Sequence, residues 1–299
     1  EQTIIVGGFS SAAAVNDSGL VAGYASTDIS DNSANIINSC VDNNSDTAPQ
    51  NICIQSAQFP NQYGYSDIQY QIRGYVWQYE AGNNTPTATM LPLGLEVTND
   101  SVYSAQGLGV NNEGVVAGRS YVYRQNDKDR LYYDAAYWTK DANGEYKYNW
   151  VNVDEARDVY SSIAYDINDA GILVDSYNKY IDGYRRDKFF YFDTNTPETA
   201  LVTPNDFYNN ISDLSSRGRD INNKGQVVGY IDTTHDKEKP RPKAGFLYQL
   251  PNSEFPDGEF NNVNNLLTCE SKGYEKNAEG NWQRHLVEVQ DGSGKTLTY

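Results

Sequence analysis

The chain has few of the residues that enzymes use most often. Its 299 residues include one methionine, three cysteines and two histidines, and the histidines, His235 and His285, are far apart in sequence. A Ser-His-Asp or Cys-His site would have to use one of them. The full phosphate-binding pattern Gly-x-x-x-x-Gly-Lys-Ser/Thr is missing, and so are Gly-x-Ser-x-Gly elbows and His-Glu-x-x-His helices. The sequence therefore favours a protein that is not an enzyme.

Long apolar runs and positive charge are also scarce. No segment approaches the roughly 20 apolar residues that a membrane-spanning helix needs. Lys and Arg number 23 against 40 Asp and Glu, a formal net charge of −17. This balance argues against a general binder of nucleic acid or of anionic membranes. The 25 tyrosines against 9 phenylalanines suit β-strands with half-exposed faces.

A nine-residue pattern, Asn-x-x-Gly-x-[Val/Leu]-x-Gly-[Tyr/Arg], is the most informative feature of the chain. Its Asn and first Gly suit a tight hairpin in which Gly takes a positive φ. The third copy has Asp175 in place of its second Gly, and the fifth keeps only the Asn and the first Gly. The five pairs are Asn16 and Gly19, Asn111 and Gly114, Asn168 and Gly171, Asn222 and Gly225, and Asn277 and Gly280.

A strand ending in an aromatic residue follows each pattern and completes a repeat of about 50 residues, the size of a propeller blade. Trp77, Trp138, Phe192, Tyr248 and Tyr299 end these strands. The last repeat stops at its third strand, and the apolar segment Glu1–Gly7 lies where a missing fourth strand belongs. We therefore predict an all-β, five-bladed β-propeller over residues 1–299, a single domain that the N-terminal strand closes. Two β-sandwiches, or an open excerpt of a longer repeat protein, are the alternatives.

These repeats resemble the HAF repeat of extracellular bacterial proteins, in which an Ile-Asn-x-x-Gly-x-Val-Val-Gly stretch precedes an Ala-Phe-x-Trp strand. The stretch Asp220–Gly229 (DINNKGQVVG) matches best. Over most of its length the chain is similar to an uncharacterised gammaproteobacterial family with such repeats. The resemblance implies export and a propeller-like fold, and it implies no catalytic residues.

The three cysteines indicate an oxidising compartment. Cys40 and Cys53 lie in a polar insertion of the first repeat, at about residues 28–68, with few apolar groups to bury. A disulfide between them would close that loop and contribute roughly 3 kcal/mol. Two free thiols are the alternative, and we expect Cys269 to be a buried, small apolar side chain.

The acidic residues suggest a calcium site or a catalytic site only weakly. The segments around Asp166 and Asp220 resemble part of a calcium loop, but they lack further ligands and a distal bidentate Glu. We therefore predict no cofactor and no metal, with calcium as the alternative at these turns or at the acidic insertion. Paired carboxylates could also serve a propeller glycan hydrolase or lyase, although 40 acidic residues will include neighbours by chance.

The connections between the second and third strands of three repeats gather the positive charge. Residues 124–130, 178–188 and 232–243 hold 11 of the 23 Lys and Arg against 7 acidic residues. In a propeller they emerge on one face, where Tyr177, Tyr180 and Tyr184 could stack on sugar rings. The predicted ligand-binding residues are Arg124, Lys128, Arg130, Tyr184, Arg185, Arg186, Lys188, Lys237, Lys239, Arg241 and Lys243.

We therefore predict a secreted or cell-surface binding module whose loop face binds an acidic polysaccharide or a cell-surface protein. The predicted location is outside the cell, on its surface or in the periplasm of a Gram-negative bacterium. Two other functions remain open. One is a structural or assembly subunit that pairs through its Tyr-rich faces, and the other is the carboxylate-dependent hydrolase or lyase.

Overall fold

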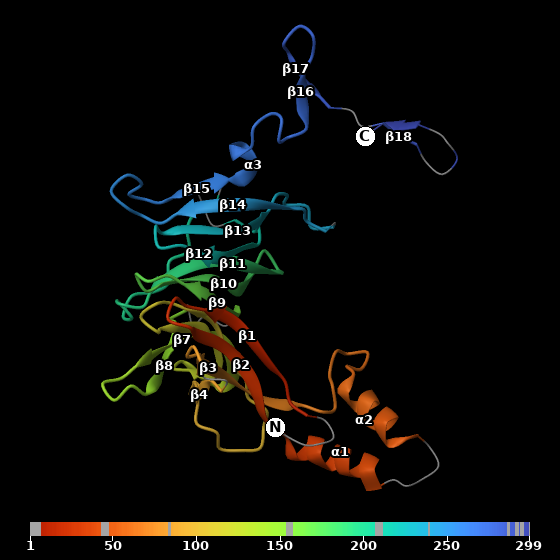
Figure 1. Cartoon of the computed structure of the whole chain (residues 1–299), viewed down its shortest axis with the longest axis vertical. Coiled ribbons are helices and arrows are strands. Elements are labelled where there is room, and N and C mark those ends of the chain that lie inside the picture. Colours follow the sequence, from red (N-terminus) through yellow and green to blue (C-terminus); the bar gives the residue numbers. More distant parts are fainter. Residues whose placement is uncertain are drawn as a thin grey trace.

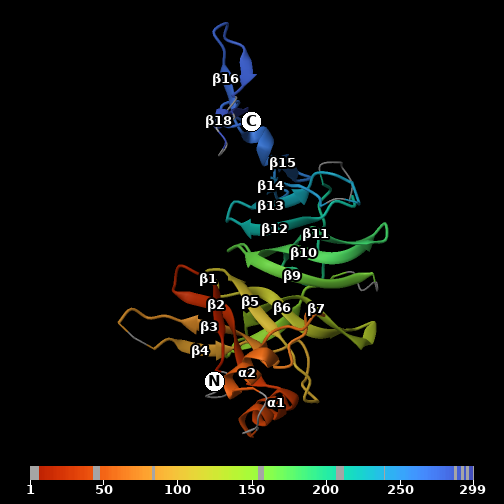
Figure 2. The ribbon, with the colours of Figure 1, turned by 90° about the vertical axis from the view of Figure 1, so that its right-hand side faces the viewer.

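The protein is a stack of twisted β-sheets, with a helical insertion at one end and hairpins at the other (Figure 1). The computed structural model describes residues 7–42, 48–82, 85–153, 158–206, 212–238, 240–285, 288–290, 293 and 296–298. The prediction of an all-β protein is confirmed. Figure 2 shows the successive sheets from a second side, with the chain advancing along the stack.

Four consecutive units build the stack, and each contains one copy of the nine-residue pattern. Unit 1 is a four-stranded antiparallel sheet of β1 (Ser10–Val15), β2 (Leu20–Ile29), β3 (Tyr70–Gln78) and β4 (Thr87–Met90). Unit 4 repeats this order with β12 (Ser216–Ile221), β13 (Gln226–Asp232), β14 (Lys243–Gln249) and β15 (Glu259–Asn262).

Units 2 and 3 join into one mixed sheet of seven strands. Unit 2 contains β5 (Ala105–Val110), β6 (Val116–Arg124), β7 (Asp127–Lys140) and β8 (Tyr146–Trp150). Unit 3 contains β9 (Val159–Ile167), β10 (Ile172–Ile181) and β11 (Tyr184–Asp193). The long strand β7 makes the junction, because it pairs in parallel with β9 at Tyr133 and Ser161.

The turn between the first two strands is the same in every unit. The first Gly of each pattern has a φ of between 73° and 83°, a conformation that side chains disfavour. The Asn side chain organises the turn, since its Oδ1 accepts the backbone N–H four residues later, as in Asn111 and Val115. The same bond forms in the other four copies of the pattern.

The same Asn residues also connect one unit to the next. The first three donate their side-chain Nδ2 to the backbone carbonyl of the next Asn: Asn16 to Asn111 at 2.9 Å, Asn111 to Asn168 at 3.0 Å, and Asn168 to Asn222 at 3.2 Å. Since every bond runs in the same direction, the turns form a polar ladder along the stack.

A second row of bonds involves the residue after each Asn. The backbone N–H groups of Asp17, Asn112 and Asp169 donate to the side-chain Oδ1 of the next row member, at 2.8 to 2.9 Å. The Asn112 amide also donates to both neighbouring carboxylates, Asp17 and Asp169. The row therefore alternates carboxylate and amide as Asp17, Asn112, Asp169 and Asn223.

Apolar side chains fill the three spaces between consecutive units. Leu20, Ala22 and Val76 of unit 1 pack against Val116 and Trp138 of unit 2. Equivalent clusters lie between units 2 and 3, around Leu173 and Phe192, and between units 3 and 4, around Val227 and Tyr248. The side chains alternate along each strand, so an internal sheet buries both of its faces.

The prediction of a closed five-bladed propeller is wrong. The sheets remain open, and the units pack face to face, which fits the sandwich alternative better. The fifth pattern forms only a short hairpin, β16 (Tyr274–Lys276) and β17 (Trp282–Arg284), whose residues are exposed. It projects beyond the short helix α3 (Val263–Leu266), and a last pair, β18 (Glu288–Gln290) and β19 (Thr296–Thr298), follows it (Figure 1).

A physical reason for the open stack is the weak fifth repeat. Its first two strands have three residues each, too few to bury a sheet face. Ala278 stands where the other units have Asp or Asn, so it has no side-chain oxygen to continue the second row. Of the proposed closing segment Glu1–Gly7, residues 1–6 lie outside the described residues, as does Tyr299.

The insertion of unit 1 contains helices where the sequence suggested only polar loop. Helices α1 (Asp31–Asp42) and α2 (Gln50–Gln58) lie at the unit 1 end in both views (Figures 1 and 2). Their few apolar residues form a small core of Ile37, Cys40, Ile54, Ala57 and Ile68. The predicted disulfide between Cys40 and Cys53 joins the two helices, with a Cα–Cα distance of 5.7 Å.

Cys269 is exposed, so the prediction that it is buried is wrong, because the segment after α3 has no sheet packed over it. Among the described residues, no helix is long and apolar enough to cross a membrane.

Candidate functional site

The basic connections between second and third strands lie along one flank of the stack. The Arg130 guanidinium, at the start of β7, lies 4.6 Å from the ring centroid of Tyr160 in unit 3. The Lys237 ammonium, between β13 and β14, lies 5.1 Å from the ring of Tyr184 at the start of β11. These contacts bring the connections of units 2, 3 and 4 next to one another.

Arg124 belongs to the interior rather than to this surface. Its guanidinium donates two hydrogen bonds to Asp134, at 2.7 and 2.8 Å, and a third to the backbone carbonyl of Val159. The residue is 1% exposed. A ligand in solution cannot reach it, so Arg124 acts as a cross-link between units 2 and 3.

Lys188 is buried in the same way. Its Nζ donates to the backbone carbonyls of Ser212 and Leu214, and it lies 3.7 Å from the Asp206 carboxylate. Burial lowers the pKa of Lys188, and the nearby carboxylates partly oppose this effect. Lys188 therefore ties β11 to the segment that enters unit 4.

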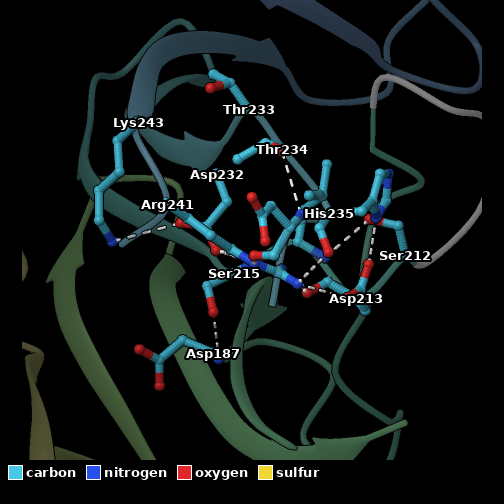
Figure 3. A network of polar contacts seen from close by, with 12 residues as sticks. Asp187, Ser212, Asp213, Ser215, Asp232, Thr233, Thr234, His235, Arg241 and Lys243 are labelled. Atoms are coloured by element: carbon cyan, nitrogen blue, oxygen red, sulfur yellow. Dashed lines mark hydrogen bonds and ion pairs between the residues drawn. The ribbon is translucent and has the colours of Figure 1, made fainter. Parts of the chain in front are cut away.

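Arg241 is the centre of a polar network between β13, β14 and the segment before β12 (Figure 3). It donates to the carboxylate and the backbone carbonyl of Asp213, at 2.8 and 2.7 Å, and lies 3.7 Å from Asp232. The side chains of these three residues are each 8% exposed or less.

Asp213 also accepts a hydrogen bond from the ring of His235 (Figure 3). Burial raises the pKa of Asp213, but the bonds from Arg241 and His235 outweigh it and hold the pKa at about 2. The carboxylate is therefore charged at neutral pH and balances Arg241. This network has a structural role, because its carboxylates and its Arg241 guanidinium already pair with one another.

Lys243 lies at the margin of this network and is half exposed. Its Nζ is 3.7 Å from Asp232 and 4.3 Å from the ring centroid of Tyr230. Asp232 pairs with both Arg241 and Lys243. Lys243 can therefore bind a ligand only by leaving this carboxylate, which would keep Arg241 as its partner.

The remaining cations are available on the surface. The guanidinium groups of Arg130 and Arg185 both lie over the Tyr160 ring, at 4.6 and 4.5 Å. Arg186 and Lys237 both lie 5.1 Å from the Tyr184 ring, which is 45% exposed. Such cation–π contacts orient the charged groups without neutralising them.

No carboxylate among the described residues forms an ion pair with Lys128, Arg130, Arg185, Arg186 or Lys237. The Nε of Arg186 is buried and has no hydrogen-bond partner in the described structure. We name these five cations, with Tyr160 and Tyr184, the basic loop surface. Lys239 lies outside the described residues.

The same loops also carry acidic residues, so the basic loop surface has mixed charge. Asp129, Asp182, Asp236 and Glu238 are exposed beside the cations. Four of the cations differ from them in lying over aromatic rings: Arg130, Arg185, Arg186 and Lys237. A ligand with both a ring and an anionic group would use this combination.

Tyr160 is the residue of this surface that sequence reasoning missed. It lies in β9, outside the connections in which charge was counted. It is the second residue of β9, eight residues before Asn168, and none of the sequence patterns marks it. Tyr180 packs edge-on against Tyr160 at 5.1 Å, whereas Tyr177 lies against Phe190 in the interior.

Of the two carboxylates that suggested calcium, Asp166 makes a structural contact. Asp166 accepts the backbone N–H of Ile221 in the next unit, at 2.9 Å, and burial raises its pKa. In the part of the chain that the structure describes, no three His, Cys, Asp or Glu residues form a group that could hold a metal ion.

Comparisons with known proteins give a family and no further relative. The whole chain, residues 1–299, matches a family described as "Protein of unknown function (DUF3466)". No curated protein and no solved structure matches the chain.

Proposed function

Because the chain belongs to the DUF3466 family, whose description gives no activity, we propose its function from the geometry of the loops. The protein is a binding module, and its basic loop surface holds an acidic polysaccharide or an acidic region of a protein. The observation that supports this proposal is the sharing of two aromatic rings by four cations. Arg130 and Arg185 meet on Tyr160, and Arg186 and Lys237 meet on Tyr184.

The contrast with the other cations of the same connections strengthens the proposal. Arg124, Lys188 and Arg241 are matched by carboxylates inside the protein. The surface cations have no carboxylate partner among the described residues, and four of them lie on rings, so they can donate charge-assisted hydrogen bonds to carboxylate or sulfate. Tyr184 could stack on a sugar ring at the same time.

The disulfide supports a location outside the reducing cytosol. Disulfides persist in secreted and periplasmic proteins and are rare in the cytosol. The bond between Cys40 and Cys53 thus fits a module of the periplasm, the cell surface or the exterior. The resemblance to HAF repeats agrees with this location.

The proposal is tested by binding of the full chain to immobilised heparin and polygalacturonate, with neutral dextran as the reference. Replacing Arg130, Arg185, Arg186 and Lys237 by Ala should weaken binding by about tenfold or more, because hydrogen bonds to charged groups contribute roughly 1.5–3 kcal/mol each. Binding by the native protein should also weaken as salt is raised.

The matched control removes the same number of charges elsewhere. Lys140, Lys147, Lys224 and Lys272 are exposed and lie outside the basic loop surface. Their replacement by Ala should leave binding close to that of the native protein. Equal losses in the two variants would show that net charge alone governs binding and would contradict the proposed surface.

A further inference from the structure

The two ends of the stack expose positions that are buried between the units. At the unit 1 end, Val21 and Trp77 face away from unit 2 and line a hollow of about 360 Å³ with Ser10, Ala12, Tyr79 and Pro86. Their equivalents are the cross-strand pairs Val116 and Trp138, Leu173 and Phe192, and Val227 and Tyr248. All six are 3% exposed or less.

The unit 4 end has the opposite half of the same interface. Val228 is 44% exposed and lies across from Leu247 on the face that points away from unit 3. The equivalent pairs are Ala22 and Val76, Ala117 and Tyr137, and Val174 and Tyr191. In units 1, 2 and 3 these side chains pack against the sheet of the next unit.

The ladder of turns has a donor without a next unit at the unit 4 end and an acceptor without a preceding unit at the unit 1 end. Asn222 lacks a next carbonyl, and its Nδ2 instead bonds to Gln226 of its own unit. Among the described residues, the backbone N–H of Asn223 has no acceptor, and the Asn16 carbonyl accepts only from Gly19. The unit 4 end thus has hydrogen-bond donors, and the unit 1 end has an acceptor that suits them.

The alternation of the second row identifies the partner. After Asp17, Asn112, Asp169 and Asn223, the next member should be a carboxylate that accepts from the Asn223 backbone and side-chain amides. The fifth repeat of the same chain has Ala278 at this place and cannot supply one. Asp17 of a second copy has the required carboxylate, on an end with the matching apolar face.

We propose that the unit 4 end of one copy binds the unit 1 end of a second copy, in a head-to-tail contact that continues the stack. Val228 and Leu247 of one copy then cover Val21 and Trp77 of the other. Asn222 and Asn223 donate to Asn16 and Asp17. Such a contact is heterologous, so each associated pair keeps one free end of each kind and can add further copies.

Two single variants of the full chain test this arrangement. Val228→Glu places a charge on the unit 4 end, and Val21→Glu places one on the unit 1 end. Sedimentation of the native protein should show a mass that rises with concentration, whereas each variant alone should remain a monomer. An equimolar mixture should give a dimer of twice the monomer mass, because each variant keeps the end that the other lacks.

The mixture distinguishes a blocked contact from a failure to fold, since only folded variants can restore dimers. Val202→Glu is the control, because Val202 is 44% exposed and pairs with Tyr191 in unit 3, between the two end units. This variant should associate like the native protein. A native protein that is monomeric at every concentration, a single end variant that still associates, or a mixture without dimers would overturn the proposal.

Discussion

Arg124 and Asp134 form a bidentate ion pair in which neither side chain is exposed to solvent. Arg124 lies at the end of β6 and Asp134 in the middle of β7, and the third bond of the guanidinium reaches Val159 in unit 3. The pair therefore fixes the joint between units 2 and 3. It also removes from the surface a cation that the sequence places among the ligand-binding residues.

Replacing Arg124 by Ala should lower the free energy of unfolding by about 3–5 kcal/mol, because Asp134 would remain buried without its partner. Arg130→Ala is the matched control, since Arg130 has the same side chain and lies on the surface. Its replacement should cost less than about 1 kcal/mol. Urea unfolding of both variants measures the difference, and equal losses would refute the division into buried and surface cations.

The turns could be predicted from the sequence because their causes are local. Asn and Gly three residues apart suffice to close the turn, and the alternating apolar residues around them specify strands. The functional role of a cation, in contrast, depends on its carboxylate partners. Lys188 meets Asp206 and Arg241 meets Asp213, on segments that no pattern connects to them.

The open stack and the helices could not be predicted from the sequence patterns, for a related reason. Repeat spacing indicates that units pack on one another, but it does not fix whether the last unit returns to the first. That depends on the packing of the fifth repeat, which is thin and exposed. Helices α1 and α2 bury few residues, among them Ile37 and Ile54, so their periodicity is weak.

The turn ladder should contribute to stability through its buried members. Asn111 is 4% exposed, and its Nδ2 donates to the Asn168 carbonyl. Asn111→Asp keeps the oxygen that organises the turn but replaces the donor by a second oxygen facing that carbonyl. We expect a loss of about 1–3 kcal/mol in the free energy of unfolding.

Asn277→Asp gives the control for this prediction. Asn277 organises the same type of turn, with its Oδ1 accepting from Asn281, but the hairpin is exposed. The change should alter stability by less than about 0.5 kcal/mol. If both Asp variants unfolded at the same urea concentration, the bonds between units would contribute nothing measurable.

Asp175 should make stability depend on pH. It takes the place of a motif glycine, is fully buried, and neither of its carboxylate oxygens accepts a hydrogen bond in the described structure. Burial raises the pKa of Asp175 to about 7, although Arg217 and Arg219 partly oppose this effect. Below pH 4 the carboxyl group is protonated in both the folded and the unfolded protein.

Between pH 4 and 7 the folded protein holds this proton and the unfolded protein releases it, so stability falls as the pH rises. The loss could reach about 4 kcal/mol, at about 1.4 kcal/mol per pKa unit. Asp175→Asn should be more stable than the native protein at pH 8 and show a flatter profile. Asp182→Asn, at an exposed turn, should keep the native profile. A native slope in Asp175→Asn would refute the assignment.

The disulfide should stabilise the helical insertion rather than the stack. Cys40 and Cys53 belong to a small core with Ile37, Ile54 and Ala57, separate from the clusters between the sheets. Opening the loop in a Cys40→Ala, Cys53→Ala variant removes about 3 kcal/mol in the chain-entropy model. A core of this size cannot offset that loss, so α1 and α2 should open locally.

Hydrogen exchange of the full chain distinguishes a local opening from a global one. The amides of α1 and α2 should lose protection in the double variant, while those of β10 and β13, inside the stack, should exchange as in the native protein. Cys269→Ala is the control, because this thiol is exposed and unpaired. It should change neither set of amides. Retained protection in both helices would show that their apolar contacts suffice, whereas lost protection in β10 and β13 would show that the insertion supports the whole stack.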